Sequence, residues 1–201
     1  MTRQQWDAQF WDNRYQEFGE QMWSGEPNGA LVAEVSALPP GRALDLGCGE
    51  GGDALWLAGR GWQVTATDIS QVALDRAARL AGASAVTWTR TDVAVTPPAA
   101  GAYDLVSAQY FPILRQPGHE TMRGVLAAVA PGGTLLFVSH DLTGHEEHID
   151  FDPKAFYEPA EVATLLDDRW TIEVHELRPR PHTPSGNPHV NDIVLRARRT
   201  G

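Results

Sequence analysis

Short apolar runs alternate with longer helical patterns along this chain of 201 residues, and no other feature constrains its fold as strongly. The runs have the length of strands, and glycine or proline residues separate most of them from the helical patterns. Five of them stand at residues 43–46, 62–67, 85–90, 103–108 and 134–139. Strands with helices between them pair in parallel, because parallel neighbours need a crossover connection. The alternation therefore predicts a mostly parallel sheet with helices on both faces.

The remaining segments complete the predicted architecture, a three-layer α/β sandwich with seven strands. Helical patterns cover residues 3–18, 27–38, 53–60, 70–81, 120–130 and 158–168. Two further strand-like runs, residues 170–177 and 190–198, have only a proline-rich loop between them, so we expect an antiparallel hairpin at one edge. A single domain is expected over residues 1–201, divided into an N-terminal helical part (1–38), a core (41–140) and a final helix with the hairpin (141–201).

The composition argues against several classes of protein. The net charge of −10 repels phosphate backbones, and the small basic clusters at 178–180 and 196–199 indicate solvated strand ends. Cys48 is the only cysteine and cannot form an internal disulfide, which is typical of a reducing compartment. The N-terminus has no signal-peptide pattern, and no apolar run approaches the roughly 20 residues of a membrane span. We therefore expect a cytoplasmic protein that binds neither nucleic acid nor membrane.

A glycine-rich loop follows the first predicted strand, with the sequence DLGCGEGG over residues 45–52. Glycines let a backbone turn sharply and approach a ligand closely. No Gly-Lys-Ser/Thr follows, so the loop is not a P-loop, while the spacing of its glycines leaves a dinucleotide fingerprint open. Asp45 and Glu50 argue against a dinucleotide, because a pyrophosphate would meet carboxylates. A ligand with a cationic group would instead be attracted.

Acidic residues also end the next two predicted strands. Asp68 lies 23 residues after Asp45, at the place where a carboxylate accepts both hydroxyls of a ribose. Ile69 follows it and suits the face of a flat base. Asp92 ends the third strand and suits an exocyclic amine such as adenine N6. Together with the glycine loop, these residues predict a pocket for an adenosine without phosphates.

At this point the chain resembles the class I methyltransferases, which have a Rossmann-like seven-stranded sheet and use S-adenosylmethionine. The resemblance rests on ALDLGCGEG (43–51), TDIS (67–70), TDV (91–93), YDLV (103–106) and PGGTL (131–135). It implies that the loop residues line the methionine and ribose side of the cofactor, that Asp68 binds the ribose hydroxyls, and that Asp92 and Val93 flank adenine. The loop residues concerned are Asp45, Gly47, Cys48 and Gly49.

The segment before the sheet is similar to the opening of small-molecule methyltransferases of the tellurite-resistance and thiopurine type. In those enzymes an N-terminal helix and loop close over the cofactor, so the resemblance implies a helical lid. Trp11 and Trp23 would place aromatic faces against the sulfonium, and Arg14 would pair with the cofactor carboxylate. The alternative is that the aromatic residues of this segment, Trp6 and Phe10 among them, only fix the helix to the core.

The loops after the fourth and fifth strands should face the transferred methyl group. His140 is the best candidate for a general base and Tyr110 is the second, although a hydrogen-bonded histidine at a strand end is the more ordinary explanation for His140. Methyltransferases of nucleic-acid amines have an Asn/Asp-Pro-Pro-aromatic signature after the fourth strand, and this chain has QYFP at 109–112 instead. The difference argues against the methylation of nucleic-acid amines. Histidines and acids at 140–150 suggest a solvated loop rather than a metal site, because no cysteine contributes.

The sequence thus predicts methyl transfer from S-adenosylmethionine to a small acceptor: a thiol, hydroxyl, amine or metalloid. We expect a monomer or homodimer without a metal. Two alternatives remain open, a nicotinamide-dependent oxidoreductase and an adenosyl-binding protein of methyltransferase type without turnover.

Overall fold

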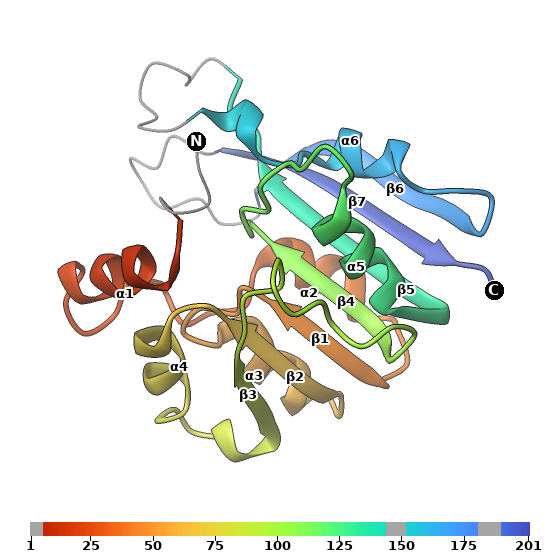
Figure 1. The fold of residues 1–201 in the computed structure, drawn as a ribbon. Coiled ribbons are helices and arrows are strands. Elements are labelled where there is room, and N and C mark those ends of the chain that lie inside the picture. Colours follow the sequence, from red (N-terminus) through yellow and green to blue (C-terminus); the bar gives the residue numbers. More distant parts are fainter. Residues whose placement is uncertain (1–5, 144–151, 181–189) are drawn as a thin grey trace.

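The computed structural model describes residues 6–143, 152–180 and 190–201, and within them the chain forms one seven-stranded sheet (Figure 1). In space the strand order is β3-β2-β1-β4-β5-β7-β6. Neighbours from β3 to β5 run parallel, whereas β7 is antiparallel to both β5 and β6. The predicted fold class is confirmed, including the antiparallel pair at one edge. The strands are β1 (Arg42–Leu46), β2 (Gln63–Asp68), β3 (Val86–Arg90), β4 (Tyr103–Gln109), β5 (Val129–His140), β6 (Trp170–Pro179) and β7 (Asn191–Arg199).

Helices cover both faces of this sheet. Helices α2 (Gly29–Val35) and α3 (Gly52–Gly59) pack on one face, and α5 (Glu120–Ala128) and α6 (Pro159–Thr164) pack on the other. Helix α4 (Gln71–Ala77) contacts β2 and β3, and α1 (Ala8–Glu17) packs against α4 (Figure 1). Short 3-10 turns stand at Ala83–Ala85 and Pro153–Ala155.

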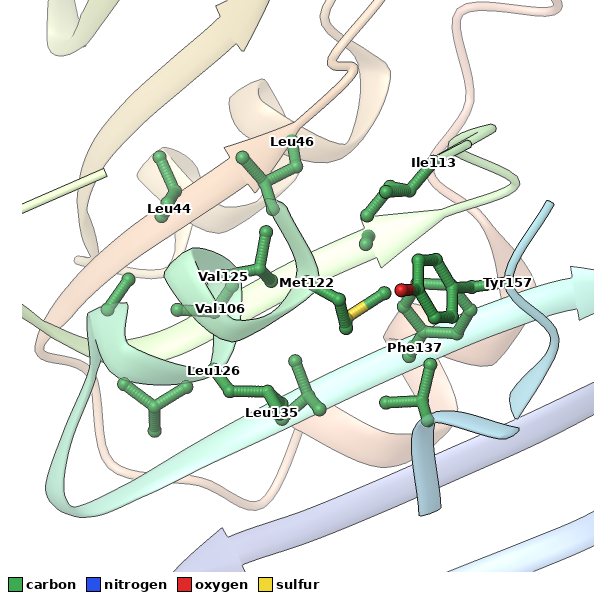
Figure 2. Packing of buried hydrophobic residues seen from close by; sticks show 14 of the residues in the cluster. Leu44, Leu46, Val106, Ile113, Met122, Val125, Leu126, Leu135, Phe137 and Tyr157 are labelled. Atoms are coloured by element: carbon green, nitrogen blue, oxygen red, sulfur yellow. The ribbon is translucent and has the colours of Figure 1, made fainter. Parts of the chain in front are cut away.

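The core is divided between the two faces because successive side chains of a strand point to opposite sides. Leu135 and Phe137 belong to the cluster beneath α5, while Leu136 and Val138 belong to the cluster beneath α2 and α3. The central strands β1, β4 and β5 are covered on both faces and are mostly buried, whereas β6 at the edge is largely exposed. Figure 2 shows the first cluster, which includes Leu44, Leu46, Val106, Met122, Val125, Leu126 and Tyr157.

Several elements differ from their predicted bounds: α2 and α4 are also shorter than predicted, and two further elements differ for local reasons. Strand β5 already begins at Val129 and includes Pro131, whereas the sequence predicted a helix to residue 130 and a strand from 134. Proline ends the helix, and an irregularity in the β4–β5 register accommodates Gly132, at φ +80°. Helix α6 ends at Thr164 rather than at 168, because Asp167 accepts a hydrogen bond from the Arg169 backbone N–H (3.0 Å) and turns the chain into β6.

Helix α1 is attached to α4 by a carboxylate. Asp12 Oδ1 accepts hydrogen bonds from the Ser70 hydroxyl (2.6 Å) and the Val72 N–H (3.1 Å). Ser70 is itself the N-cap of α4, since its hydroxyl accepts from the Ala73 N–H (3.2 Å). A side chain of one helix thus satisfies a free N–H in the first turn of another, and this fixes where the N-terminal segment lies.

We expect Asp12→Ala to lower the free energy of unfolding by about 1–2 kcal/mol, because it removes a capping carboxylate. Urea denaturation measures this loss, and limited proteolysis within the first 20 residues should become faster. Asp75→Ala is the matched control, since Asp75 bonds only the exposed Gln71 side chain on α4. Equal effects of the two substitutions would contradict the role of Asp12.

Candidate cofactor and acceptor site

The strand order reverses between β1 and β4. Helix α3 follows β1 and α5 follows β4, and these helices cover opposite faces of the sheet. The chain therefore leaves the two neighbouring strands in opposite directions, and open α/β sheets bind ligands beyond the carboxyl ends of strands at such a point. The glycine-rich loop over residues 47–52 lies here.

This loop has a backbone that side chains would obstruct. Gly47 and Gly49 have φ angles of +66° and +52°, in the left-handed region. A Cβ atom on Gly47 would lie 2.3 Å from the Phe111 ring, and one on Gly49 would lie 2.9 Å from the Tyr15 hydroxyl. Both glycines are therefore required by conformation and by space. Phe111, which follows β4, and Tyr15 of the N-terminal segment both lie against this loop.

Three buried carboxylates surround the loop. Asp45, Asp53 and Asp68 are only 2%, 7% and 9% exposed. Burial raises the pKa of each, and for Asp45 the charges of Asp53 and Asp68 raise the pKa further. Asp53 accepts from the Asn28 backbone N–H (2.7 Å) and amide Nδ2 (2.9 Å), whereas Asp45 Oδ2 has no hydrogen-bond partner among the described residues. Such a site favours a ligand that carries an ammonium or sulfonium.

Asp68 holds the loop in shape. Its Oδ2 accepts from the Gly49 N–H (2.9 Å) and its Oδ1 from the Ser70 N–H (2.8 Å). Each carboxylate oxygen has a second lone pair, so these bonds leave acceptor capacity for the two hydroxyls of a ribose. The geometry is compatible with the predicted role of Asp68.

The other predicted cofactor residues lie around the same loops. Burial and the charges of Asp45 and Asp68 raise the pKa of Cys48, so its thiol stays protonated. Ile69 is partly buried beside Asp68. Asp92 follows β3 and accepts from the Ala94 N–H (2.9 Å), while Val93 packs in the cluster beneath α5. Their contacts with adenine stay predictions.

Glu50 has a role that the sequence did not suggest. It is 6% exposed, and its carboxylate accepts from the backbone N–H groups of Met22 (3.0 Å) and Trp23 (2.8 Å). Arg76 of α4 forms an ion pair with it at 2.8 Å and also donates to the Tyr15 carbonyl oxygen (2.9 Å). The glycine loop therefore anchors the segment that follows α1. No spacing in the sequence links these residues, which lie 26–28 positions from Glu50.

The aromatic residues of the N-terminal segment divide into two groups. Trp23 Nε1 donates to the Tyr15 hydroxyl (3.1 Å), and both side chains lie near Gly49, although the Trp23 side chain is 52% exposed. Trp11 is partly buried, and its ring lies 5.7 Å from that of Trp6. Arg14 is on the exposed side of α1, with its guanidinium 5.5 Å from the Phe18 ring centroid. The cofactor contacts of Trp11 and Arg14 stay predictions.

The two candidate bases lie against each other at the ends of β4 and β5. The rings of Tyr110 and His140 stack with centroids 4.1 Å apart and planes 19° apart. The Tyr110 hydroxyl donates to Asp192 Oδ2 (2.9 Å), and His140 Nδ1 lies 3.6 Å from Asp192 Oδ1. Burial and the Asp192 charge raise the pKa of Tyr110, so this hydroxyl stays protonated. His140 therefore remains the better candidate base.

Two negative findings concern the part of the chain that the structure describes. No group of three or more histidine, cysteine or acidic residues could hold a metal ion there. No helix there is long and apolar enough to cross a membrane. His145 and His148, which belong to the segment that the sequence predicted to be a solvated loop, lie outside the described residues.

The chain is similar to several known proteins. Residues 43–133 match the family described as "Methyltransferase domain". The malonyl-[acyl-carrier protein] O-methyltransferase of Enterobacter lignolyticus (strain SCF1) is 32% identical over 114 residues, which cover 55% of this chain and 43% of that protein. The ribosomal RNA small subunit methyltransferase C of Chromohalobacter salexigens is 30% identical over 133 residues, which cover 64% and 38%. The matches span less than half of either relative.

Solved structures resemble the chain over more of its length. A structure described as "Conversion of a Disulfide Bond into a Thioacetal Group during Echinomycin Biosynthesis" has a TM-score of 0.74 at 24% identity, covering 96% of this chain and 91% of the other. The N-methyltransferase NodS of Bradyrhizobium japonicum WM9, in complex with S-adenosyl-L-homocysteine, has a TM-score of 0.62 at 20% identity, covering 86% and 84%.

Residues 43–133 therefore resemble the methyltransferase domain of class I enzymes. The residues that match the family include the whole glycine-rich loop, Asp68 and Asp92. The interpretation as a methyltransferase is therefore favoured over that as a nicotinamide-dependent oxidoreductase. S-adenosylmethionine is the cofactor of this class. Its ammonium and sulfonium suit the three carboxylates, and Asp45 Oδ2 is a buried acceptor that such a group would satisfy.

The raised pKa of Asp45 has a measurable consequence for the stability of the cofactor-free protein. A carboxyl whose pKa is raised in the folded state contributes to the stability of the protein at low pH. This contribution is lost as pH rises through the raised pKa, and it is complete only below the ordinary value of 3.8. We expect Asp45→Asn to raise the melting temperature at neutral pH. The variant should also show a smaller rise in melting temperature on acidification than the wild type does.

Asp104→Asn is the control with the opposite sign. Arg42 lowers the pKa of Asp104, so that carboxylate stabilises the fold above 3.8 and the stability is lost as pH falls through the lowered value. Thermal unfolding followed by circular dichroism, from neutral pH to well below the ordinary carboxyl value of 3.8, measures both variants. A lower melting temperature for Asp45→Asn at neutral pH would contradict the assigned electrostatics.

Proposed function

We propose that this chain transfers the methyl group of S-adenosylmethionine to a small-molecule acceptor. The observation that carries the proposal is the buried Asp45 carboxylate oxygen, which has no hydrogen-bond partner in the described part of the chain and lies beside a glycine loop whose shape Asp68 holds. When bound, the cofactor supplies a methyl group on a sulfonium, which an acceptor takes by in-line displacement. The protein's own residues orient the two reactants and exclude water, which can supply most of the rate enhancement.

The charge distribution supports a small acceptor rather than a nucleic acid. The net charge is −10, and three arginines of the two basic clusters, Arg178, Arg180 and Arg196, lie beside acids. Glu34 forms ion pairs with Arg178 (2.6 Å) and Arg196 (2.9 Å), and Asp192 lies 3.4 Å from Arg180 Nε. Neutralised arginines contribute little to binding a phosphate backbone. The acceptor named for one of the two curated relatives, ribosomal RNA, is therefore less favoured here.

Isothermal titration with S-adenosylhomocysteine tests the cofactor, and NAD is the control ligand. We expect micromolar binding of the first and none of the second. An acceptor screen with thiols, phenols, amines and metalloid oxyanions, read as formation of S-adenosylhomocysteine, then tests turnover. Transfer to RNA alone would contradict the small acceptor, and binding without any turnover would favour an adenosyl-binding protein.

Asp68→Ala should weaken S-adenosylhomocysteine binding by about 2–4 kcal/mol, because charge-assisted hydrogen bonds to the ribose are lost. Asp104→Ala is the matched control, since Asp104 lies near the start of β4, away from the loop, and accepts a hydrogen bond from the Arg42 N–H. Titration calorimetry measures the affinity of both variants for S-adenosylhomocysteine. An unchanged affinity in Asp68→Ala would remove the ribose assignment.

We further propose that the N-terminal segment is a lid over the cofactor and that Trp23 is the aromatic residue that contacts it. Trp23→Ala should weaken S-adenosylmethionine binding by about 0.5–2 kcal/mol, as expected for loss of a cation–π contact. Phe18→Ala is the control, because Phe18 is an equally exposed aromatic residue of the same segment, at 54% against 52%. If both variants bind like the wild type, Trp23 only supports the fold of the segment.

A further inference from the structure

Asp192 is a buried charge at the acceptor side of the sheet that sequence reasoning did not single out. It lies in β7, and the antiparallel register places it opposite His140 of β5. The residue is only 2% exposed. A buried carboxylate is costly unless other groups compensate its charge, so its neighbours indicate its purpose.

The two carboxylate oxygens of Asp192 face different partners. Oδ2 accepts the Tyr110 hydroxyl at 2.9 Å. Oδ1 lies 3.6 Å from His140 Nδ1 and 3.4 Å from Arg180 Nε, and it has no hydrogen bond among the described residues. One oxygen is therefore committed to tyrosine, and the other lies between two cationic or proton-bearing nitrogens.

Tyr110 fixes the plane of the histidine ring. Its own ring stacks on His140 at 4.1 Å, and the guanidinium of Arg180 lies 5.1 Å from the Tyr110 ring centroid. The backbone of Tyr110 has a φ angle of +54°, a conformation that side chains other than glycine rarely adopt. Such a conformation persists only where the surroundings impose it, and it is frequent at functional sites.

The cluster also lies next to the glycine loop. Phe111 follows Tyr110 directly, and its ring packs so closely on Gly47 that a Cβ atom there would lie 2.3 Å away. The loop that would hold the cofactor and the strand ends that carry Tyr110 and His140 are thus in contact through adjacent residues.

We propose that Asp192 is a positioning residue that keeps the proton of neutral His140 on Nδ1, so that Nε2 can accept a proton from the methyl acceptor. As the acceptor atom bonds the methyl carbon, the bond between that carbon and the sulfonium sulfur breaks and S-adenosylhomocysteine is released. The acceptor's proton passes to Nε2, and Asp192 stabilises the imidazolium until this proton leaves to water. Tyr110 holds the ring and Asp192 in register but does not take the proton. This inference rests on the proposed methyl transfer.

The proposal narrows the class of acceptor. A base is useful only where the acceptor atom carries a proton with a high pKa. A phenol, an alcohol or a protonated amine meets this condition, whereas a carboxylate or a thiolate does not. The favoured acceptor of this chain is therefore a hydroxyl or an amine.

Nitrogen NMR of the histidine rings tests the positioning without any acceptor. The full chain is labelled with ¹⁵N-histidine and studied at mildly alkaline pH, and the signals of His140 are identified by their loss in His140→Gln. The wild type should carry the ring proton on Nδ1. A proton on Nε2 would overturn the proposal, whatever the variants show.

Two variants separate Asp192 from Tyr110. In Asp192→Asn the Tyr110 hydroxyl needs the amide oxygen, so the amide NH₂ faces His140 and should move the ring proton to Nε2. Tyr110→Phe leaves the carboxylate in place and should keep the proton on Nδ1. The same ring proton in the wild type and in a folded Asp192→Asn protein would overturn the role of Asp192.

Binding and turnover then distinguish this inference from the proposed function. Asp192→Asn should bind S-adenosylhomocysteine like the wild type, while kcat with a phenol found in the screen should fall by about 100-fold or more at unchanged KM for S-adenosylmethionine. An unchanged kcat would overturn the inference alone. Failure of the wild type to bind S-adenosylhomocysteine would instead overturn the proposed function.

Discussion

The carboxylate of Asp68 joins the two loops on which the rest of the site depends. It accepts the N–H of Gly49 (2.9 Å) after β1 and the N–H of Ser70 (2.8 Å) before α4. Tyr15 and Trp23 close on Gly49, and the Ser70 hydroxyl donates to Asp12 of α1. One buried carboxylate therefore connects the glycine loop, α4 and the N-terminal segment. Bonds from N–H groups to an ionised carboxylate are directional and strong, so they define this geometry more strictly than apolar contacts would.

The burial of carboxylates in this site is energetically unfavourable, and a bound ligand can offset this penalty. Asp45, Asp53 and Asp68 are all buried, and the pKa of each is raised because the charged form is poorly solvated. A cationic ligand that binds only the folded chain would offset this repulsion and stabilise it. On the acceptor side, Asp192 is equally buried, but Tyr110, His140 and Arg180 surround it. Each half of the site is thus organised by acids in a low-dielectric environment.

The fold was largely predictable, because its signals are local. The apolar runs located all seven strands to within a few residues, and the largest deviation was β5, where Pro131 and Gly132 enter the strand through an irregular register instead of separating it from the helix. The glycine loop and the acids Asp45 and Asp68 could also be identified, since they stand directly after or within strands. Glu50 was found as an acid of the loop, but its partner Arg76 could not be, because that ion pair depends on how α4 packs.

The sequence by itself determined which segments are strands, which helices separate them, and that a glycine loop with acids stands at the carboxyl ends of the strands. Periodicity and turn residues encode these features within a few positions of each other. Only the tertiary structure decided that Asp192 reaches Tyr110 across 82 residues and that Glu50 holds the backbone 27 residues before it. Those pairings follow from the insertion of β7 between β5 and β6 and from the docking of α1 on α4. Such long-range geometry is set by packing of the whole domain, which no local pattern contains.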